Sequence, residues 1–313
     1  MKVALVVNPF ATRVSEERLA EVRAELERVV ELEVFLTEHP GHATELVTGA
    51  CRRGVEAIVV FSGDGGFNEA LNGLESDIPI GFLPGGGTSV FSRGLGLPAD
   101  PIQAAGSVAQ ALEDGRTRRI TVGRVNGRRF AFGAGVGLDA EAVRRVDTRG
   151  RQPDGKRPGD LAFALAIVRA LAAHRGHLEP ELEVAGLGRA ALAFVANGSP
   201  YTYAKALPLS IAPEARYELG LDLVAPIRVR RRTLIGTAIR IVTGRVRSGP
   251  YLYGHDLDRV EIACDRPMPL HADGEDLGDV EQVVFEAERD AVSVLVGRRR
   301  TTARKKRGAN PVR

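Results

Sequence analysis

Apolar and polar positions follow two different periods along the first hundred residues. Short apolar runs predict buried strands, and between them apolar residues recur every three to four positions, as in helices that cover a sheet. The predicted strands span 3–7, 33–36, 57–61 and 80–83, and the predicted helices span 16–30, 42–53 and 67–74. This alternation is typical of a parallel sheet buried on both faces. We therefore expect an N-terminal α/β domain with a Rossmann-like parallel sheet over residues 1–122.

The pattern changes to short strand-like segments from about residue 117. These segments span 118–125, 128–132, 181–184, 190–195, 222–225, 260–263 and 280–286. A single helical pattern over 160–173 interrupts them. Many short strands separated by turn residues predict an all-β domain, here a C-terminal β-sandwich over 123–290. A last strand within 291–297 can return to the first domain.

Charge is concentrated at the end of the chain. Eight of the 43 Lys and Arg residues lie in 298–313, which contains no acid, so the remaining chain carries 35 basic against 40 acidic side chains. We expect this tail to be disordered.

The composition limits the class of protein. The 44% hydrophobic content excludes wholesale disorder, and no run approaches the roughly 20 apolar residues that span a bilayer. Cys51 and Cys264 lie far apart without a metal-binding pattern, which favours a cytoplasmic protein.

The sharpest chemical signal follows the third predicted strand. Ser62-Gly63-Asp64-Gly65-Gly66 precedes the helix predicted at 67–74, which contains Asn68-Glu69. Glycines allow backbone N–H groups to approach a ligand, and a helix N-terminus attracts anions such as phosphates. Because Asp64 would repel phosphates, its presence implies Mg²⁺ or a proton-transfer role. The alternative is a tight turn in which Asp64 caps a helix.

A second glycine turn, Pro84-Gly85-Gly86-Gly87-Thr88-Ser89, follows the next strand. Thr88 and Ser89 can cap the following helix or bind phosphate. Because the carboxyl ends of parallel strands share one edge of the sheet, the two turns are expected to line one crevice.

These motifs resemble the diacylglycerol kinase catalytic-domain family, soluble bacterial lipid kinases related to sphingosine kinases and more distantly to NAD kinases. The family's hallmark is a Gly-Gly-Asp-Gly-Thr loop followed by Asn-Glu and Asn-Gly, and this chain has Ser62 to Gly66, Asn68-Glu69 and Asn72-Gly73. Further segments match the family pattern in order along the chain. They are Asn8-Pro9, Thr37 with 40–43, 84–88 with Phe91 and Arg93, 135–140, Asn197-Gly198, 213–215, 220–222 and Asp273-Gly274-Glu275.

The resemblance implies ATP- and Mg²⁺-dependent transfer of the γ-phosphate to a lipid hydroxyl, with diacylglycerol the first candidate and phospholipid metabolism the setting. ATP would lie on the α/β domain, in a cleft against the sandwich. The implied nucleotide-binding residues are Asn8, Pro9, Thr12, Thr37, Ser62, Gly63, Asp64, Gly65, Gly66, Asn68, Glu69, Gly87 and Thr88. Asp64 would organise the phosphate–metal centre, and Glu275 would be the general base on the acceptor hydroxyl. Taken alone, Asp273-Gly274 is an ordinary hairpin turn.

Three departures from the family pattern bear on activity. Gly66 stands where the hallmark loop has threonine, and Ser62 stands where it has its first glycine. The lost threonine hydroxyl would have bound phosphate or metal. Either Thr88 or Ser89 replaces it, or activity is reduced. The second turn has Ser89-Val90 where the family has Asn-Asp. Glu218 stands where the family holds a structural Mg²⁺ through an aspartate, so Glu218 is a metal candidate together with Asp64.

A basic stretch, Arg228 to Arg247, contains seven arginines, no acid and several apolar residues. It predicts either peripheral binding to an anionic membrane, aided by the tail at 298–313, or a solvated helix that packs its apolar side on the sandwich. In the first case, we expect a cytoplasmic enzyme that also binds peripherally at the inner face of the membrane. We expect no nucleic-acid partner, and the sequence allows a homodimer.

Two other functions stay open. One is phosphorylation of a soluble acceptor, as in the NAD kinases. The other is a nucleotide-binding regulator without catalysis, which the glycine at position 66 suggests.

Overall fold

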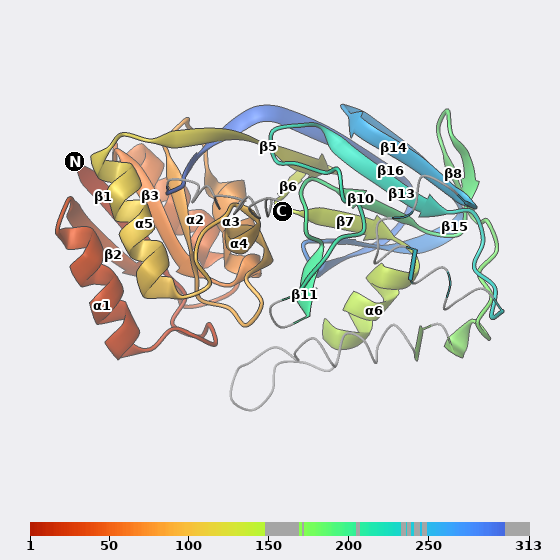
Figure 1. Ribbon diagram of the computed structural model, residues 1–313, viewed down its shortest axis with the longest axis horizontal. Coiled ribbons are helices and arrows are strands. Elements are labelled where there is room, and N and C mark those ends of the chain that lie inside the picture. Colours follow the sequence, from red (N-terminus) through yellow and green to blue (C-terminus); the bar gives the residue numbers. More distant parts are fainter. Residues whose placement is uncertain are drawn as a thin grey trace, which may run out of the picture.

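An α/β part and a β-rich part lie side by side in the computed structural model (Figure 1), which describes residues 1–147, 169–170, 172–204, 207–232, 236, 239–240, 245 and 249–297. The helices are α1 (Glu16–Glu27), α2 (His42–Arg52), α3 (Asp64–Gly73), α4 (Val90–Gly94), α5 (Pro101–Glu113) and α6 (Leu138–Asp147). The strands of the first part are β1 (Lys2–Val7), β2 (Glu31–Leu36), β3 (Ala57–Ser62), β4 (Ile80–Pro84) and β5 (Thr117–Val125). The remaining strands are β6 (Arg128–Phe130), β7 (Gly133–Val136), β8 (Leu182–Val184), β9 (Gly188–Ala190), β10 (Ala193–Ala196), β11 (Thr202–Ala204), β12 (Leu207–Leu209), β13 (Leu221–Pro226), β14 (Tyr251–Leu257), β15 (Arg259–Ala272) and β16 (Glu275–Leu295).

The α/β part is a parallel sheet in the order β2–β1–β3–β4. Every residue of β3 and β4 is buried, because α1 and α5 cover one face and α2, α3 and α4 cover the other. This burial explains the unbroken apolar runs of the sequence, since alternation is lost when both faces of a strand are covered. The predicted Rossmann-like parallel sheet is confirmed.

The β-rich part is antiparallel and follows the order β14–β13–β10–β7–β15–β16. Its core includes Phe130 and Phe285, which are fully buried. Their rings pack edge to face, with 6.3 Å between the ring centroids. Helix α6 lies against β15 and β16 (Figure 1).

One strand belongs to both parts. The first half of β16 pairs with β15, whereas its last residues pair with the start of β5 and, through Val294 and Ile80, with β4. The pairing of β16 with β5 is irregular between Glu288 and Val292, where Asp290 has a positive φ of 50°. The last strand expected within 291–297 is therefore the end of β16. The domain bounds expected from the sequence stay a prediction.

Several elements differ from those expected. Helix α3 begins at Asp64 rather than near residue 67, because Gly63 takes the N-cap position in extended backbone. The segment 190–195 is divided between β9 and β10, and helices α5 and α6 were not predicted. The tail at 298–313, most of the predicted helix at 160–173, and much of the basic stretch 228–247 lie outside the described residues. Among the described helices, none combines the length and the apolar character that crossing a membrane requires.

Candidate active site

Three loops meet where β1, β3 and β4 end. The backbone N–H of Gly85 donates to the carbonyl of Ser62 at 2.7 Å, and that of Arg13 donates to the carbonyl of Gly85 at 2.8 Å. The two glycine turns also touch, because a Cβ added to Gly86 would lie 2.9 Å from Cα of Gly63. Glycine at these positions therefore allows the turns to pack against each other. The two turns do lie side by side, as their spacing predicted.

Asp64 joins these two turns. It stands in the first turn of α3, and its carboxylate accepts hydrogen bonds from the backbone N–H groups of Val90 (2.9 Å) and Phe91 (3.0 Å), which open α4. Burial raises the pKa of Asp64 to about 6, although the hydrogen bonds from Phe91 and Val90 and the charge of Arg93 act in the opposite direction. Asp64 thus caps a helix, but it is the helix of the neighbouring turn.

Ser62 occupies the space beside Gly66. A Cβ added at Gly66 would lie 2.1 Å from Ser62 Oγ and 2.8 Å from Ser62 Cβ. Ser62 is 2% exposed, and its hydroxyl has no hydrogen-bond partner among the described residues. The hydroxyl that the hallmark loop would carry at position 66 is therefore present here on the strand side of the turn, at position 62.

Glu275 reaches the first glycine turn from the β-rich part. It follows the tight turn between β15 and β16, in which Asp273 and Gly274 have φ of 49° and 79°. Its Oε1 atom lies 3.2 Å from the place of a Cβ on Gly65, and its Oε2 atom forms an ion pair with Arg128. A carboxylate thus lies directly over the glycine turn, as the predicted role of general base requires.

Asp273 holds this hairpin in place. Its buried carboxylate accepts hydrogen bonds from the backbone N–H groups of Ala131 (2.5 Å), Phe132 (2.9 Å) and Gly133 (3.1 Å), and from Nδ2 of Asn68 (2.8 Å). Burial raises the pKa of Asp273, while these hydrogen bonds act to lower it. The contact with Asn68 fastens the hairpin to α3.

Two residues expected to bind the nucleotide have structural roles. Asn68 is completely buried, and its amide is engaged by Asp273, Arg128 and the carbonyl of Arg129. Glu69 accepts a hydrogen bond from the backbone N–H of Ala43, in the first turn of α2, at 3.2 Å. Both side chains thus support the turn, and nucleotide binding by them stays a prediction.

The other predicted nucleotide residues lie at the same edge of the sheet. Thr37 is 7% exposed, and its N–H donates to the carbonyl of Val7 at the end of β1. Asn8 accepts a hydrogen bond from the N–H of Phe10 at 3.0 Å, which fixes the first loop. Pro9, Thr12 and Gly87 are exposed, and Thr88 is half-buried. Nucleotide binding by these residues stays a prediction.

Asp64 and Glu275 bring carboxylate oxygens to the first glycine turn, and hard oxygen donors are the ligands that Mg²⁺ prefers. The residues present therefore fit a magnesium ion bound together with phosphate oxygens. Glu218 forms an ion pair with Arg118 at 3.4 Å. Its metal role stays a prediction.

A histidine cluster was not expected from the sequence. His39, His42 and Glu45 form the one group of three metal-ligand side chains found in the described part of the chain. Nδ1 of His42 accepts the N–H of Glu38 at 3.1 Å, so the proton of the neutral ring lies on Nε2 and that nitrogen has no lone pair for a metal. The neutral ring of His42 therefore offers no nitrogen to a metal ion.

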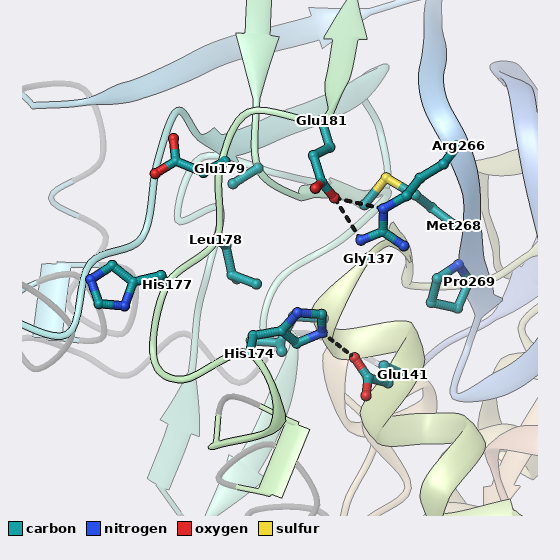
Figure 2. Close-up of a pocket in the computed structure, with 12 residues that line it drawn as sticks. Gly137, Glu141, His174, His177, Leu178, Glu179, Glu181, Arg266, Met268 and Pro269 are labelled. Carbon is teal, nitrogen blue, oxygen red and sulfur yellow. Dashed lines mark hydrogen bonds and ion pairs between the residues drawn. The ribbon is translucent and has the colours of Figure 1, made fainter.

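A separate pocket of about 150 Å³ lies in the β-rich part, between α6, the segment 174–181 and β15 (Figure 2). Its charged lining residues are paired: Glu141 with His174, Glu181 with Arg266, and Glu179 with Arg228. The pocket does not include the glycine turns or Glu275.

Comparison with known proteins identifies the family. Residues 2–125 match the family model of the diacylglycerol kinase catalytic domain, and residues 133–296 match that of the YegS C-terminal NAD kinase beta sandwich-like domain. The chain belongs to the diacylglycerol kinase family. This lipid kinase is 27% identical over 286 residues to the diacylglycerol kinase of Bacillus subtilis, covering 88% of this chain and 89% of that protein. It is also 34% identical over 133 residues to a diacylglycerol kinase of Mycobacterium tuberculosis, over 41% and 42% of the two chains.

Solved structures show the same fold. A diacylglycerol kinase from Bacillus anthracis superposes with a TM-score of 0.70 at 20% identity, over 95% of this chain and 97% of that one. An NAD kinase from Archaeoglobus fulgidus in complex with ATP superposes with a TM-score of 0.54 at 16% identity, over 95% and 94%. The expected β-sandwich and the expected class of enzyme, a kinase that phosphorylates an alcohol group, are thereby confirmed.

The sequence did not point to Arg128 in this kinase. Asn126-Gly127 is a strong hairpin signal, and it correctly separates β5 from β6. Arg128 follows this turn, and its contact with Glu275 depends on the pairing of strands that are far apart in the sequence. No local sequence pattern indicates that pairing.

Proposed function

We propose that this chain transfers the γ-phosphate of ATP to the hydroxyl of a lipid alcohol, with diacylglycerol the first candidate. The observation that carries the proposal is the position of Glu275, whose Oε1 lies over Gly65 in the first glycine turn. Two parts of the chain thus bring a general base to a phosphate-binding type of loop. The names of the relatives support the choice of a lipid acceptor.

The residues of the site divide the chemical work. Backbone N–H groups at the start of α3, a helix of 10 residues, form the positive end of the helix dipole and suit the phosphate chain. Magnesium, when bound near Asp64, supplies positive charge to the phosphates. Glu275 takes the proton of the acceptor hydroxyl, whose oxygen bonds to the γ-phosphorus as ADP leaves. The products are ADP and a phosphorylated lipid.

The proposal is tested by incubating the enzyme with γ-labelled ATP, Mg²⁺ and a total lipid extract, and then separating the labelled lipids by class. We expect one labelled lipid class, and we expect Glu275→Gln to lower its rate of formation by roughly 10²–10⁴-fold, the usual contribution of a general base. Glu286→Gln is a matched control, because Glu286 lies exposed on the same strand and pairs with Arg259.

Three other outcomes of this labelling experiment would each lead to a different conclusion. Near wild-type turnover in Glu275→Gln would refute the role of that carboxylate. Label in a water-soluble product in place of a lipid would favour the soluble acceptor. ATP binding without transfer to any acceptor would favour the regulator.

A further inference from the structure

Arg128 is a cation in direct contact with the proposed base. It opens β6, just after the turn at Asn126-Gly127, and its Nη2 forms an ion pair with Oε2 of Glu275. The same guanidinium donates to Oδ1 of Asn68, from Nη2 at 2.8 Å and from Nε at 3.3 Å. Arg128 therefore bridges helix α3, which begins in the glycine turn, and the hairpin that carries Glu275.

The two oxygens of Glu275 face different neighbours. Oε1 lies next to Gly65, and Oε2 is held by Arg128. Asn68 is itself held by Asp273, so the guanidinium rests on a fixed acceptor. The Arg128 side chain is 37% exposed, and its Nη1 makes no hydrogen bond to the described residues. Nη1 of Arg128 is thus available to donate to a phosphate bound at the first glycine turn.

Neighbouring arginines are engaged in other contacts. Arg129 binds Glu288 and donates to the carbonyls of Leu71 and Leu74, which are part of the scaffold. Arg93 lies over the ring of Tyr203 at 3.5 Å and donates to the carbonyl of Thr88. Asp64 lies in the turn and Glu275 beside it, so a transferring phosphate adds negative charge to two carboxylates and needs a nearby cation.

We propose that Arg128 binds the transferring phosphate and at the same time holds Glu275 in position for the acceptor. This inference rests on the proposed kinase function. In the transfer, the hydroxyl proton passes to Glu275 and the hydroxyl oxygen bonds to the γ-phosphorus. The bond between that phosphorus and the bridging oxygen breaks, with its electron pair leaving on ADP. Arg128 stays protonated and donates to the non-bridging oxygens, for which the planar guanidinium is well shaped.

Nucleotide binding tests this assignment without turnover. Isothermal titration calorimetry would compare ADP with a non-hydrolysable β,γ-imido analogue of ATP, in the wild type, Arg128→Gln and Arg128→Lys. Only the analogue has a γ-phosphate, so we expect Arg128→Gln to weaken its binding by roughly tenfold and to change ADP binding by less than about twofold. Arg128→Lys keeps the charge and should lose less.

Arg129→Gln is the matched control. It removes a neighbouring guanidinium from the scaffold, so we expect a lower melting temperature and an unchanged ratio of analogue to ADP affinity. Equal weakening of both ligands in Arg128→Gln would show a merely structural role, and wild-type affinity for both would overturn the phosphate contact.

Turnover separates this inference from the proposed function. We expect Arg128→Gln to lower kcat about 100-fold, with a smaller change in the KM for lipid. If Glu275→Gln keeps its activity, the kinase mechanism fails. If Glu275→Gln is inactive while Arg128→Gln binds the analogue and turns over normally, only the role of Arg128 fails.

Discussion

Replacing Gly66 by threonine would restore the residue that the family's hallmark loop has at this position, and we nevertheless expect the change to destabilise this chain. The added Cβ would lie 2.1 Å from Ser62 Oγ and 2.8 Å from Ser62 Cβ, whereas non-bonded heavy atoms normally keep about 3.5–4.0 Å apart. Ser62 is 2% exposed, so its hydroxyl cannot turn out into solvent to avoid the added atoms. The two positions therefore cannot both carry a side chain without local rearrangement.

The expected size of the effect follows from this overlap. Overpacking of a filled interior costs about 1–3 kcal/mol, and threonine, with two heavy atoms beyond Cβ, belongs at the upper end. At about 2–4 °C per kcal/mol, Gly66→Thr should lower the melting temperature by roughly 4–12 °C. Ser62→Gly alone should cost only about 0.5–1 kcal/mol, as glycine does in a strand. The double variant should regain most of the loss, because Ser62→Gly removes both clashing atoms.

Thermal unfolding followed by far-UV circular dichroism would measure this, since the chain contains no tryptophan to report on unfolding. Gly87→Ala is the control, because a Cβ there meets no atom within 4 Å and should change stability by less than about 0.5 kcal/mol. Strictly additive losses in the double variant, or an unchanged melting temperature in Gly66→Thr, would show that the two positions are independent.

Two further predictions concern the buried acids of the site. Burial raises the pKa of Asp64 to about 6, above the ~3.9 of an unfolded chain, so the folded protein takes up this proton first as the pH falls. The ionised carboxylate therefore costs stability above pH 6, and the cost disappears toward pH 4. The melting-temperature difference between Asp64→Asn and wild type should change between pH 7 and pH 5 in favour of the wild type, and a constant difference would contradict this. Asp273→Ala leaves three buried N–H groups without an acceptor and should cost about 3–5 kcal/mol in urea unfolding, more than Asp273→Asn; equal losses would be inconsistent with the network.

Local pattern predicted much of the α/β part, and the reason is visible in its burial. Strands such as β3 are covered on both faces, so their apolar runs stand out from the helical spacing around them. The two glycine turns could be placed together because parallel strands share one carboxyl edge. The long strand β16 was seen only in pieces, since its burial pattern is irregular along its length.

The contacts of the site were less accessible to the sequence. Asp64 could be recognised as a helix cap or a metal-site residue, but its partners, Val90 and Phe91, belong to the next turn. Arg128 and Glu275 meet only because β5, β6, β15 and β16 pair in one sheet. Such meetings depend on strand order, which local periodicity does not encode.

The continuity of β16 constrains how the two parts can move. Its first residue, Glu275, faces the first glycine turn, and its last residues pair beside β4, the strand that leads into the second turn. Glu275 and the parallel sheet are thus connected by a single hydrogen-bonded strand instead of a loose linker. The pairing with β5 is irregular between Glu288 and Val292, and a strand bends most readily where its ladder is interrupted. A small change of angle at that point would be transmitted along the strand and would open or close the gap between the Glu275 carboxylate and the first glycine turn.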